Sequence, residues 1–492
     1  MSTLQLVDGF LLNNRTDQEI LPTTTETEME AATGGLVLTP SSGLLDYVGV
    51  FDLKSLYPST MLTLNLSRET IVDNEADADI IVPDVPLNDN QVSGDRITER
   101  DISWEFDDGI GIRFDQQGFL PKYGSMLFSE RDAMKQRRSQ FDYESSEWVV
   151  WDNKQRAIKV MQNSLFGVSD NKYFRLSREG LGGAITAGSR YVTWKGSEII
   201  REMGHDVVYG DTDSVFVQLG NSEEDSIEQA VETGKQIAAT LNESMDEVAD
   251  DFGLPAVHPH FDSDVVHGTE RTAFHWEYES TLRRFLQTGK KKRYAGARIW
   301  EDGEFLNEPS YKIKGYETRR SDLPSIGAEV QETVLQRVLD GDSFDEISGY
   351  LRAIVTDIRE GEISLDRIAI PGSLNKQPED YPNMPKRRAC LYANDHIDGL
   401  WWSEGDSPWV CYVKSVPDDK PVTDVIAMPW NVESLPDGFE LDVETHIEKF
   451  VEGPLEPILD ELGWKFSELA SGKRTQAIDL SAGPSDDTNP FS

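Results

Sequence analysis

Residues 207–219, VVYGDTDSVFVQL, give the strongest indication of the fold and the chemistry of this chain. β-Branched and aromatic residues flank a short polar segment, which predicts a β-hairpin with Gly210 and Asp211 at its bend. Asp211 and Asp213 are two positions apart, so in this context their side chains lie on one face. Two close carboxylates repel each other unless a cation lies between them, and hard divalent cations prefer oxygen ligands. The hairpin alone leaves an acidic surface turn and a metal site equally open.

The composition of the 492-residue chain predicts a folded protein of about two to four structural units. Its 38% hydrophobic content and 11 tryptophans are typical of folded proteins. No long apolar run and no basic-then-apolar leader is present, which predicts a cytoplasmic protein without a membrane partner. The two cysteines, Cys390 and Cys411, form no metal-ligand pattern and suit a reducing compartment.

The charge balance is strongly acidic, with 47 basic and 89 acidic residues and a formal net charge of −42. Taken by itself, this excess argues against nucleic-acid binding, which relies on Lys and Arg. The acidic residues are dispersed along the chain, however, and dispersed negative charge favours solubility at very high salt. We therefore predict a halophilic source. Against this background the basic clusters stand out, at 131–138, 154–159, 283–293, 319–320 and 386–388.

The order of patterns along the chain predicts a mixed α and β organisation. Residues 1–45 look like an irregular leader, and 70–118 look like an acidic excursion with short strands. Apolar periodicity predicts helices over 126–147, 152–167, 178–203 and 225–250. Strands are predicted over 46–53, 207–219, 273–300 and 407–416. The region from 313 onward is otherwise predicted to be mostly helical, and the tail at 481–492 to be disordered. His258 and His260 flank a proline, which favours a surface turn over a metal site.

A second acidic position lies in FDLKSLYPST at 51–60. Asp52 ends a predicted strand, and Pro58 predicts a turn shortly afterwards. A carboxylate at a strand end, followed by successive backbone N–H groups, suits phosphate oxygens. The alternative is a strand that simply leaves the sheet through a surface loop.

The helix predicted at 152–167 carries an anion-binding pattern. Its residues Arg156, Lys159, Asn163 and Phe166 recur at helical spacing and therefore line one face. On the preceding helix, three cations also share a face, namely Arg131, Lys135 and Arg138. Two antiparallel helices with basic faces would hold an anion between them. Carboxylates that bind two metal ions, with cations for a leaving pyrophosphate, are the requirements of phosphoryl transfer.

These motifs together resemble the polymerase core of family B DNA polymerases, of the archaeal replicative kind. FDLKSLYPS (51–59) is similar to motif A of the family, KVMQNSLFG (159–167) to motif B and YGDTDS (209–214) to motif C. GKKKRY (289–294) resembles the KKRY element of the family. KGYETRRSD (314–322) and the ending EGPLEPILDELGW (452–464) resemble its thumb. The resemblance runs over roughly 30–480 in the order of the family.

The resemblance implies an α+β fold, a right-hand polymerase core with an antiparallel-sheet palm, two-helix fingers and a mostly helical thumb. The implied divisions are a leader at 1–45, palm at 46–118 and 172–297, fingers at 119–171, thumb at 298–480 and a tail at 481–492. About 45 residues precede motif A, so we expect the N-terminal and exonuclease domains to be absent and proofreading to be lacking.

The resemblance also assigns roles to individual residues. Asp52 and Asp213 would bind two Mg²⁺ ions, with Asp211 a third carboxylate of the metal site and of lesser catalytic weight, and Lys159 would also be catalytic. Tyr57 would exclude a 2′-hydroxyl, and Phe166 stands where the family usually has Tyr. The remaining deoxynucleotide contacts would come from Ser55, Leu56, Arg131, Lys135, Lys159 and Asn163, and primer-template DNA contacts from Lys291, Lys292, Arg293 and Tyr294.

Several alternatives stay open alongside an active DNA polymerase core. The chain could be the C-terminal piece of a split polymerase that needs an exonuclease-bearing partner, or a catalytically silent DNA-binding paralogue. Synthesis of RNA is disfavoured by Tyr57. A sliding clamp is a further expected partner, although the tail lacks paired aromatic residues. The excursion at 70–118 is longer than the family's connection and has no assigned function.

Overall fold

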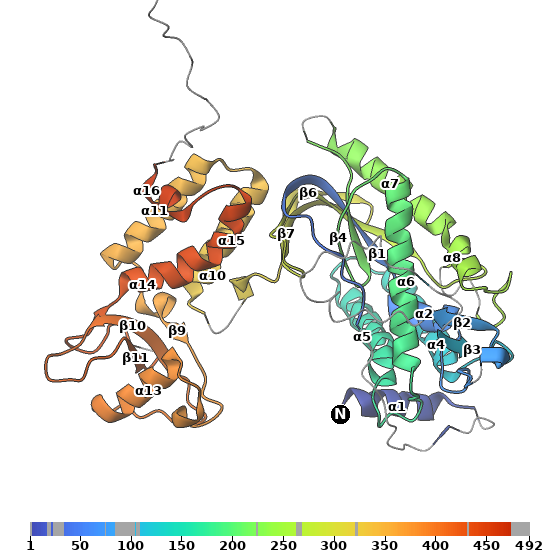
Figure 1. Cartoon of the computed structure of the whole chain (residues 1–492), viewed down its shortest axis with the longest axis horizontal. Helices are drawn as coiled ribbons and strands as arrows, with labels where there is room; N and C mark the ends of the chain where they lie inside the picture. The colour runs from blue at the N-terminus through green and yellow to red at the C-terminus, as the bar shows by residue number, and fades with distance from the viewer. Residues whose placement is uncertain are drawn as a thin grey trace, which may run out of the picture.

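The computed structural model describes residues 2–16, 21–22, 34–73, 75–83, 104, 109–222, 225–261, 268–319, 323–430 and 432–473. The chain forms two lobes, an N-terminal lobe that ends with strand β8 (Glu304–Lys314) and a C-terminal lobe from helix α10 (Ser325–Asp340) onward (Figure 1). The predicted mixture of helices and strands is confirmed. The tail at 481–492 and much of the acidic excursion lie outside the described residues.

The N-terminal lobe is built on a six-stranded sheet in the order β4-β5-β1-β6-β7-β8. All neighbouring strands are antiparallel. The other five strands are β1 (Gly43–Leu53), β4 (Val207–Asp211), β5 (Ser214–Gln218), β6 (Trp276–Gln287) and β7 (Tyr294–Glu301). Near the end of β1, Asp52 lies opposite Ser214 on one side and Glu277 on the other. The register therefore brings three distant segments together around Asp52.

The bend of the β4–β5 hairpin lies later than the sequence predicts. Gly210 is inside β4 and Asp211 is its last residue, while Thr212 and Asp213 make the turn, with a left-handed φ of 62° at Thr212. Packing explains the glycine, because a Cβ atom at Gly210 would lie 2.6 Å from Leu38 Cδ1. The glycine therefore serves a close approach rather than the bend.

The two faces of the sheet are covered by different cores. Helices α6 (Leu181–Glu202) and α7 (Ile227–Glu243) pack on one face, and α8 (Met245–Asp251) follows them (Figure 1). Phe51, Val215 and Trp276 point into that core, whereas Val50 and Phe216 point into a smaller cluster on the other face. This alternation is what a strand buried on both faces requires.

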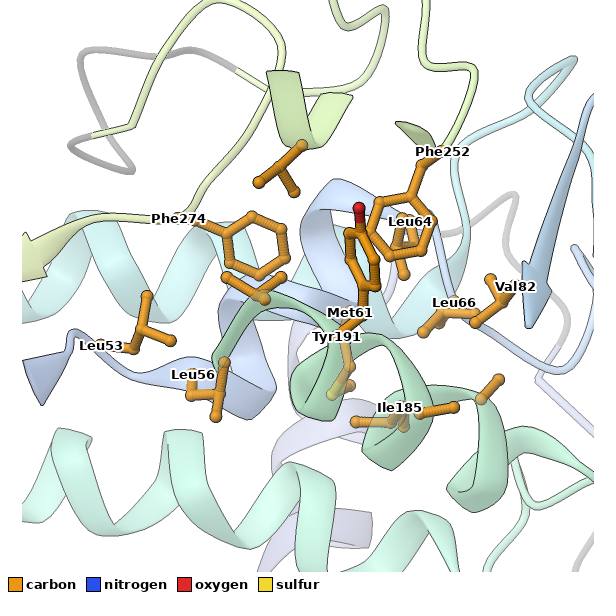
Figure 2. Packing of buried hydrophobic residues seen from close by; sticks show 14 of the residues in the cluster. Leu53, Leu56, Met61, Leu64, Leu66, Val82, Ile185, Tyr191, Phe252 and Phe274 are labelled. Carbon is orange, nitrogen blue, oxygen red and sulfur yellow. The ribbon is translucent and has the colours of Figure 1, made fainter. Parts of the chain in front are cut away.

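Helix α2 (Leu56–Thr63) continues directly from β1 and is almost completely buried. Figure 2 shows residues before, within and after it packed among side chains from α6 and later segments, including Leu56, Met61, Ile185 and Phe274. The segment that carries Asp52 is thus held between a sheet and a buried helix. The turn predicted after Asp52 is present at Lys54 and Ser55, but Pro58 does not make it, because Pro58 lies in the first turn of α2, where proline is tolerated.

Helices α4 (Phe119–Arg138) and α5 (Ser146–Ser169) form an antiparallel pair beside α2. Both begin earlier than predicted, and residues 139–145 form a connection inside the first predicted helix. Local capping explains why α5 begins at Ser146, because the side chain of Ser145 accepts a hydrogen bond from the backbone N–H of Trp148. Short strands were predicted for the excursion, and the structure has two that pair in antiparallel fashion, β2 (Ile80–Pro83) and β3 (Gly109–Ile112).

The described residues among the first 45 include regular structure, which the prediction of an irregular leader did not contain. Helix α1 (Thr3–Asn14) begins with a reciprocal capping box between Ser2 and Gln5, and it buries Val7 and Leu11 in the main core. The capping pattern was visible in the sequence, but the apolar stripe is too short to indicate a core helix. Further along, the Thr212 N–H donates to the Leu36 carbonyl oxygen at 2.8 Å, so this segment supports the hairpin bend.

Two smaller differences concern helix boundaries and His258. The helix predicted at 225–250 is divided into α7 and α8 at Ser244, whereas α6 agrees with the prediction for 178–203. His258 is buried, not on a surface turn, and its Nε2 lies 3.1 Å from the Thr63 carbonyl oxygen at the end of α2.

The C-terminal lobe combines helices with a small sheet. Its further helices are α11 (Phe344–Glu360), α12 (Leu365–Ile368), α13 (Pro385–His396), α14 (Val443–Ile447), α15 (Gly453–Glu461) and α16 (Phe466–Ser471). The sheet contains β9 (Ile370–Pro371), β10 (Trp409–Ser415), β11 (Val425–Met428) and β12 (Glu440–Leu441). The strand predicted at 407–416 is confirmed as β10.

Candidate active site

A pocket of ≈ 320 Å³ opens where the end of β1 and the start of α2 meet helices α4 and α5. Of the residues that the sequence assigned to catalysis and nucleotide binding, all except Asp211 line it. They are Asp52, Ser55, Leu56, Tyr57, Arg131, Lys135, Lys159, Asn163, Phe166 and Asp213. The fold thus brings together side chains from four separate segments, with carboxylates at one side and cations from the helical pair at the other.

Asp52 and Asp213 form the acidic side of the pocket. Asp52 Oδ1 accepts a hydrogen bond from Ser214 Oγ at 2.7 Å. Burial, and then the charge of Asp213, raise the pKa of Asp52 to about 7. Burial also raises the pKa of Asp213, with the charges of Asp211 and Glu279 adding to it. Within the described part of the chain neither carboxylate has an ion pair, so both would be stabilised by a bound cation.

Two buried carboxylates are ligands of the kind that hard divalent cations such as Mg²⁺ prefer. This ion is held in proteins by one or two carboxylates, with water and substrate phosphates completing its shell. No cluster of three or more His, Cys, Asp or Glu that could hold a metal occurs among the residues that the structure describes. A metal at Asp52 and Asp213 would therefore depend on substrate oxygens for the rest of its ligands.

The link between β1 and α2 presents backbone groups to the pocket. Ser55 adopts a left-handed conformation with φ of 52° and precedes the first turn of α2. The N–H groups of Leu53 and Lys54 donate to the carbonyl oxygens of Asp213 and His275. The N–H groups of the first helical turn have no acceptor inside the helix, which suits an anion.

The cationic side of the pocket comes from α4 and α5. Arg131 and Lys135 lie one turn apart on α4, and Lys159 and Asn163 lie one turn apart on α5. Burial lowers the pKa of both Arg131 and Lys135, and the positive charges of Arg131 and Lys54 lower the pKa of Lys135 further. An anion in the pocket would offset these costs.

The rings of Tyr57 and Phe166 close one wall of the pocket. They stack with centroids 3.9 Å apart and planes inclined by 10°. Burial, and then the charge of Asp213, raise the pKa of the Tyr57 phenol, so it remains neutral. The pair connects the start of α2 with the end of α5.

Three lining residues were missed by the sequence prediction, namely Lys54, Pro58 and Glu277. Lys54 forms an ion pair with Glu277 at 3.4 Å between Nζ and Oε1. Lys54 was inside a quoted motif and could have been included. Glu277 had no local signal, because only the pairing of β6 with β1 brings it beside Asp52.

Asp211 lies outside the pocket lining and pairs with Lys292, whose Nζ is 2.5 Å from Asp211 Oδ1. The other residues predicted to contact DNA differ in exposure. Lys291 is exposed, and its Nζ donates to the Val37 carbonyl oxygen at 3.0 Å. The guanidinium of Arg293 lies over the ring of Tyr316, with Cζ 4.8 Å from the ring centroid.

Tyr294 is 8% exposed and packs against Tyr209, Phe216 and Phe285. It is thus a core residue of the smaller sheet face, and a contact of its ring with DNA stays a prediction.

Two cations of the predicted helical faces point away from the pocket lining. Arg138 and Arg156 both bind Asp152, at 2.5 and 2.6 Å between nitrogen and carboxylate oxygen. The stripe predicted from Arg156 to Phe166 is therefore divided, because its last three members line the pocket whereas Arg156 pairs with Asp152 one turn earlier on the same helix.

Comparison with known proteins agrees with these motifs. The sequence model described as "DNA polymerase family B" matches residues 3–248 and 261–394. A DNA polymerase of Archaeoglobus fulgidus is 27% identical over 392 residues, which cover 79% of this chain and 41% of the relative. The DNA polymerase alpha catalytic subunit of Xenopus laevis is 24% identical over 372 residues, covering 74% of this chain and 22% of that protein. This chain thus spans less than half the length of these relatives.

A solved structure supports the same relationship. The family B DNA polymerase of Pyrobaculum calidifontis superposes with a TM-score of 0.62 at 25% identity, covering 93% of this chain and 51% of the other. In the described regions, none of the helices combines the length and apolar character needed to span a bilayer.

Proposed function

Because the chain belongs to DNA polymerase family B, we propose that it catalyses template-directed DNA synthesis by adding deoxynucleotides to a primer 3′ end. The observation that carries the proposal is the single pocket shared by Asp52, Asp213 and the cations of α4 and α5. In this proposal the six-stranded sheet with its covering helices is the palm. Helices α4 and α5 are the fingers, and the C-terminal lobe is the thumb.

The proposed reaction is nucleotidyl transfer, with Asp52 and Asp213 holding two Mg²⁺ ions. When bound, these ions would activate the primer hydroxyl and stabilise the leaving oxygen. The raised pKa of both carboxylates supports the assignment, because a cation would favour their charged forms. Asp211 is held by Lys292 and is proposed to act only through the local field.

The other pocket residues would position the incoming deoxynucleotide. Arg131, Lys135 and Lys159 would bind its triphosphate, together with the backbone N–H groups of Ser55 and Leu56. Asn163 would orient the triphosphate. The three cations would neutralise charge on the leaving pyrophosphate. The stacking of Tyr57 on Phe166 supports a role of Tyr57 in excluding a 2′-hydroxyl, because the contact restricts the movement of its ring.

Primer-template DNA is the proposed macromolecular partner. Lys291 and Lys292 are exposed beside the hairpin and would contact the duplex backbone without reading sequence. Arg293 and Tyr294 would support this element from within. A sliding clamp and an exonuclease-bearing chain are further proposed partners, and the absence of excision by this chain stays a prediction. The dispersed charge of −42 supports the proposal of a halophilic, cytoplasmic polymerase of the archaeal replicative type.

Primer extension at molar KCl with Mg²⁺ tests the proposal, using the full chain and a labelled primer annealed to a template. The Asp213→Ala variant should lose extension by several orders of magnitude, whereas Asp246→Asn, at an exposed position of α8, should extend as the wild type does. Lack of extension by the wild type would refute the activity of this chain. Efficient extension by Asp213→Ala would refute the carboxylate assignment. A mismatched primer end, incubated without nucleotides, tests for excision.

A further inference from the structure

A buried polar network joins α4 to α5 behind the pocket. Asp152 and Gln155 lie on the inner face of α5, and the two residues are only 4% and 7% exposed. Asp152 Oδ1 accepts hydrogen bonds from Arg138 Nη1 at 2.5 Å and from Gln155 Nε2 at 3.1 Å. Its other oxygen, Oδ2, binds Arg156 Nε at 2.6 Å. Asp152 is therefore held in place from both helices.

The carboxylate of Asp152 fixes which way the Gln155 amide faces. A carboxylate accepts hydrogen bonds only, so the amide nitrogen of Gln155 must face Asp152. The amide oxygen then faces Arg131, whose Nε lies 3.4 Å from Gln155 Oε1. This contact is longer than most N–H···O hydrogen bonds.

The contact uses only one of the guanidinium nitrogens of Arg131. Because a guanidinium is planar, a partner at Nε sets the plane in which Nη1 and Nη2 lie. Those two nitrogens can then bind oxygens in the pocket that Arg131 lines. A Gln155 amide in the opposite orientation would present its nitrogen to Arg131 and repel it.

We propose that Gln155, held by Asp152, is a positioning residue that orients Arg131 toward the triphosphate of the incoming deoxynucleotide. The inference rests on the proposed function, and it adds residues that do not line the pocket. Gln155 acts only through Arg131, so its contribution should vanish when the guanidinium is removed. Asp152 also ties Arg138 to the same network, so the network joins α4 to α5.

Gln162 supplies a matched control on the same helix. Its side chain is 1% exposed, and neither amide atom has a hydrogen-bond partner among the described residues. Replacing either glutamine by methionine keeps the chain length and removes the amide. A change that affects only the packing of α5 should therefore appear in both variants.

The experiment measures binding and incorporation of dATP by the full chain on a primer-template. Equilibrium binding is followed with Ca²⁺ in place of Mg²⁺, and incorporation is followed in single turnovers with Mg²⁺. Gln155→Met should weaken dATP binding about tenfold, since it removes a hydrogen bond to a charged group. Gln162→Met should leave the dATP dissociation constant within about twofold, and primer-template affinity should be unchanged in both.

A double-mutant cycle with Arg131→Met separates positioning from a structural effect. In the Arg131→Met background, Gln155→Met should produce no further loss of dATP binding. An equal loss in that background, an equal loss in Gln162→Met, or wild-type binding by Gln155→Met would each overturn the proposal. If Gln155→Met does not fold, Asp152→Asn keeps the side-chain shape and should weaken dATP binding severalfold through the same network.

The two readouts distinguish this inference from the proposed function. A wild type that binds dATP without extending the primer would refute the polymerase activity, while the binding cycle would still decide the role of Gln155. A wild type that extends the primer, with a Gln155→Met variant of unchanged dATP affinity, would refute the positioning role alone.

Discussion

Lowering the pH should destabilise the N-terminal lobe through His258, which is 3% exposed and bound to the end of α2. Burial lowers the pKa of His258 from its ordinary 6.5 to about 4. In the unfolded chain the ring therefore gains a proton before it does in the folded chain. The stabilisation is fully present above pH 6.5 and is lost as the pH falls toward 4.

The magnitude follows from the two pKa values. Each unit of difference corresponds to about 1.4 kcal/mol, so the full effect is about 3.4 kcal/mol. Between about pH 7.5 and about pH 5 the free energy of unfolding should fall by about 2 kcal/mol from this residue. His258 is buried, so solvent screening reduces this figure little. Protonation would also repel the nearby N–H of His260, whose nitrogen lies 3.2 Å from His258 Nδ1.

The assay compares the wild type with His258→Gln, which keeps a donor for the Thr63 carbonyl oxygen but does not titrate. Hydrogen exchange of the α2 amides at several pH values, corrected for intrinsic rates, reports the opening free energy of this part of the lobe. On acidification from about pH 7.5 to about pH 5, the opening free energy of the wild type should fall by about 2 kcal/mol more than that of His258→Gln. A difference that stays constant with pH would refute the reasoning. His205→Gln, at a less buried position, is the matched control and should leave the pH dependence unchanged.

Further predictions concern the pocket and the hairpin. Binding of Mn²⁺ to the full chain should tighten as the pH rises through about 7, because the Asp52 carboxyl must lose its proton. Calorimetry in two buffers of different ionisation enthalpy should detect the release of that proton. Phe166→Ala should increase ribonucleotide incorporation by the full chain, because Tyr57 would lose its stacking partner. Phe166→Tyr should preserve the discrimination against ribonucleotides, and equal discrimination in the two variants would contradict this role of the stacked rings. Gly210→Ala should destabilise the lobe by about 1–3 kcal/mol in urea unfolding, because its Cβ would meet Leu38, and an unchanged midpoint would show that Leu38 moves away freely.

The pocket residues were predictable because they lie within short motifs with strong local chemistry. Asp52, Lys159 and Asp213 could each be named from their neighbours, and the fold brings them together as expected. Glu277 could not be named, because its place depends on the register between β1 and β6. Gln155 was likewise hidden, since an uncharged residue in a helix gives no sign of its partners before the helices pack.

Segment boundaries were less predictable for a related reason. Gly210 suggested a turn, although its small size is required by Leu38, which is far away in the sequence. The helix at residues 3–14 has a visible capping box, but only tertiary contacts make Val7 and Leu11 core residues. Local signals thus located the chemistry better than they located the ends of helices and strands.

The central place of β1 has a consequence for how the chain acquires its site. Asp52 and its partner Ser214 are 162 positions apart, and β6 must also arrive before β1 is paired on both sides. Contacts so distant in sequence form slowly, because a long loop must close before any pairing is gained. During synthesis the carboxylate of Asp52 therefore emerges from the ribosome long before its neighbours. Helices will form early and metal affinity late, so the recovery of Mn²⁺ binding should lag behind helical content when the unfolded chain is returned to native conditions.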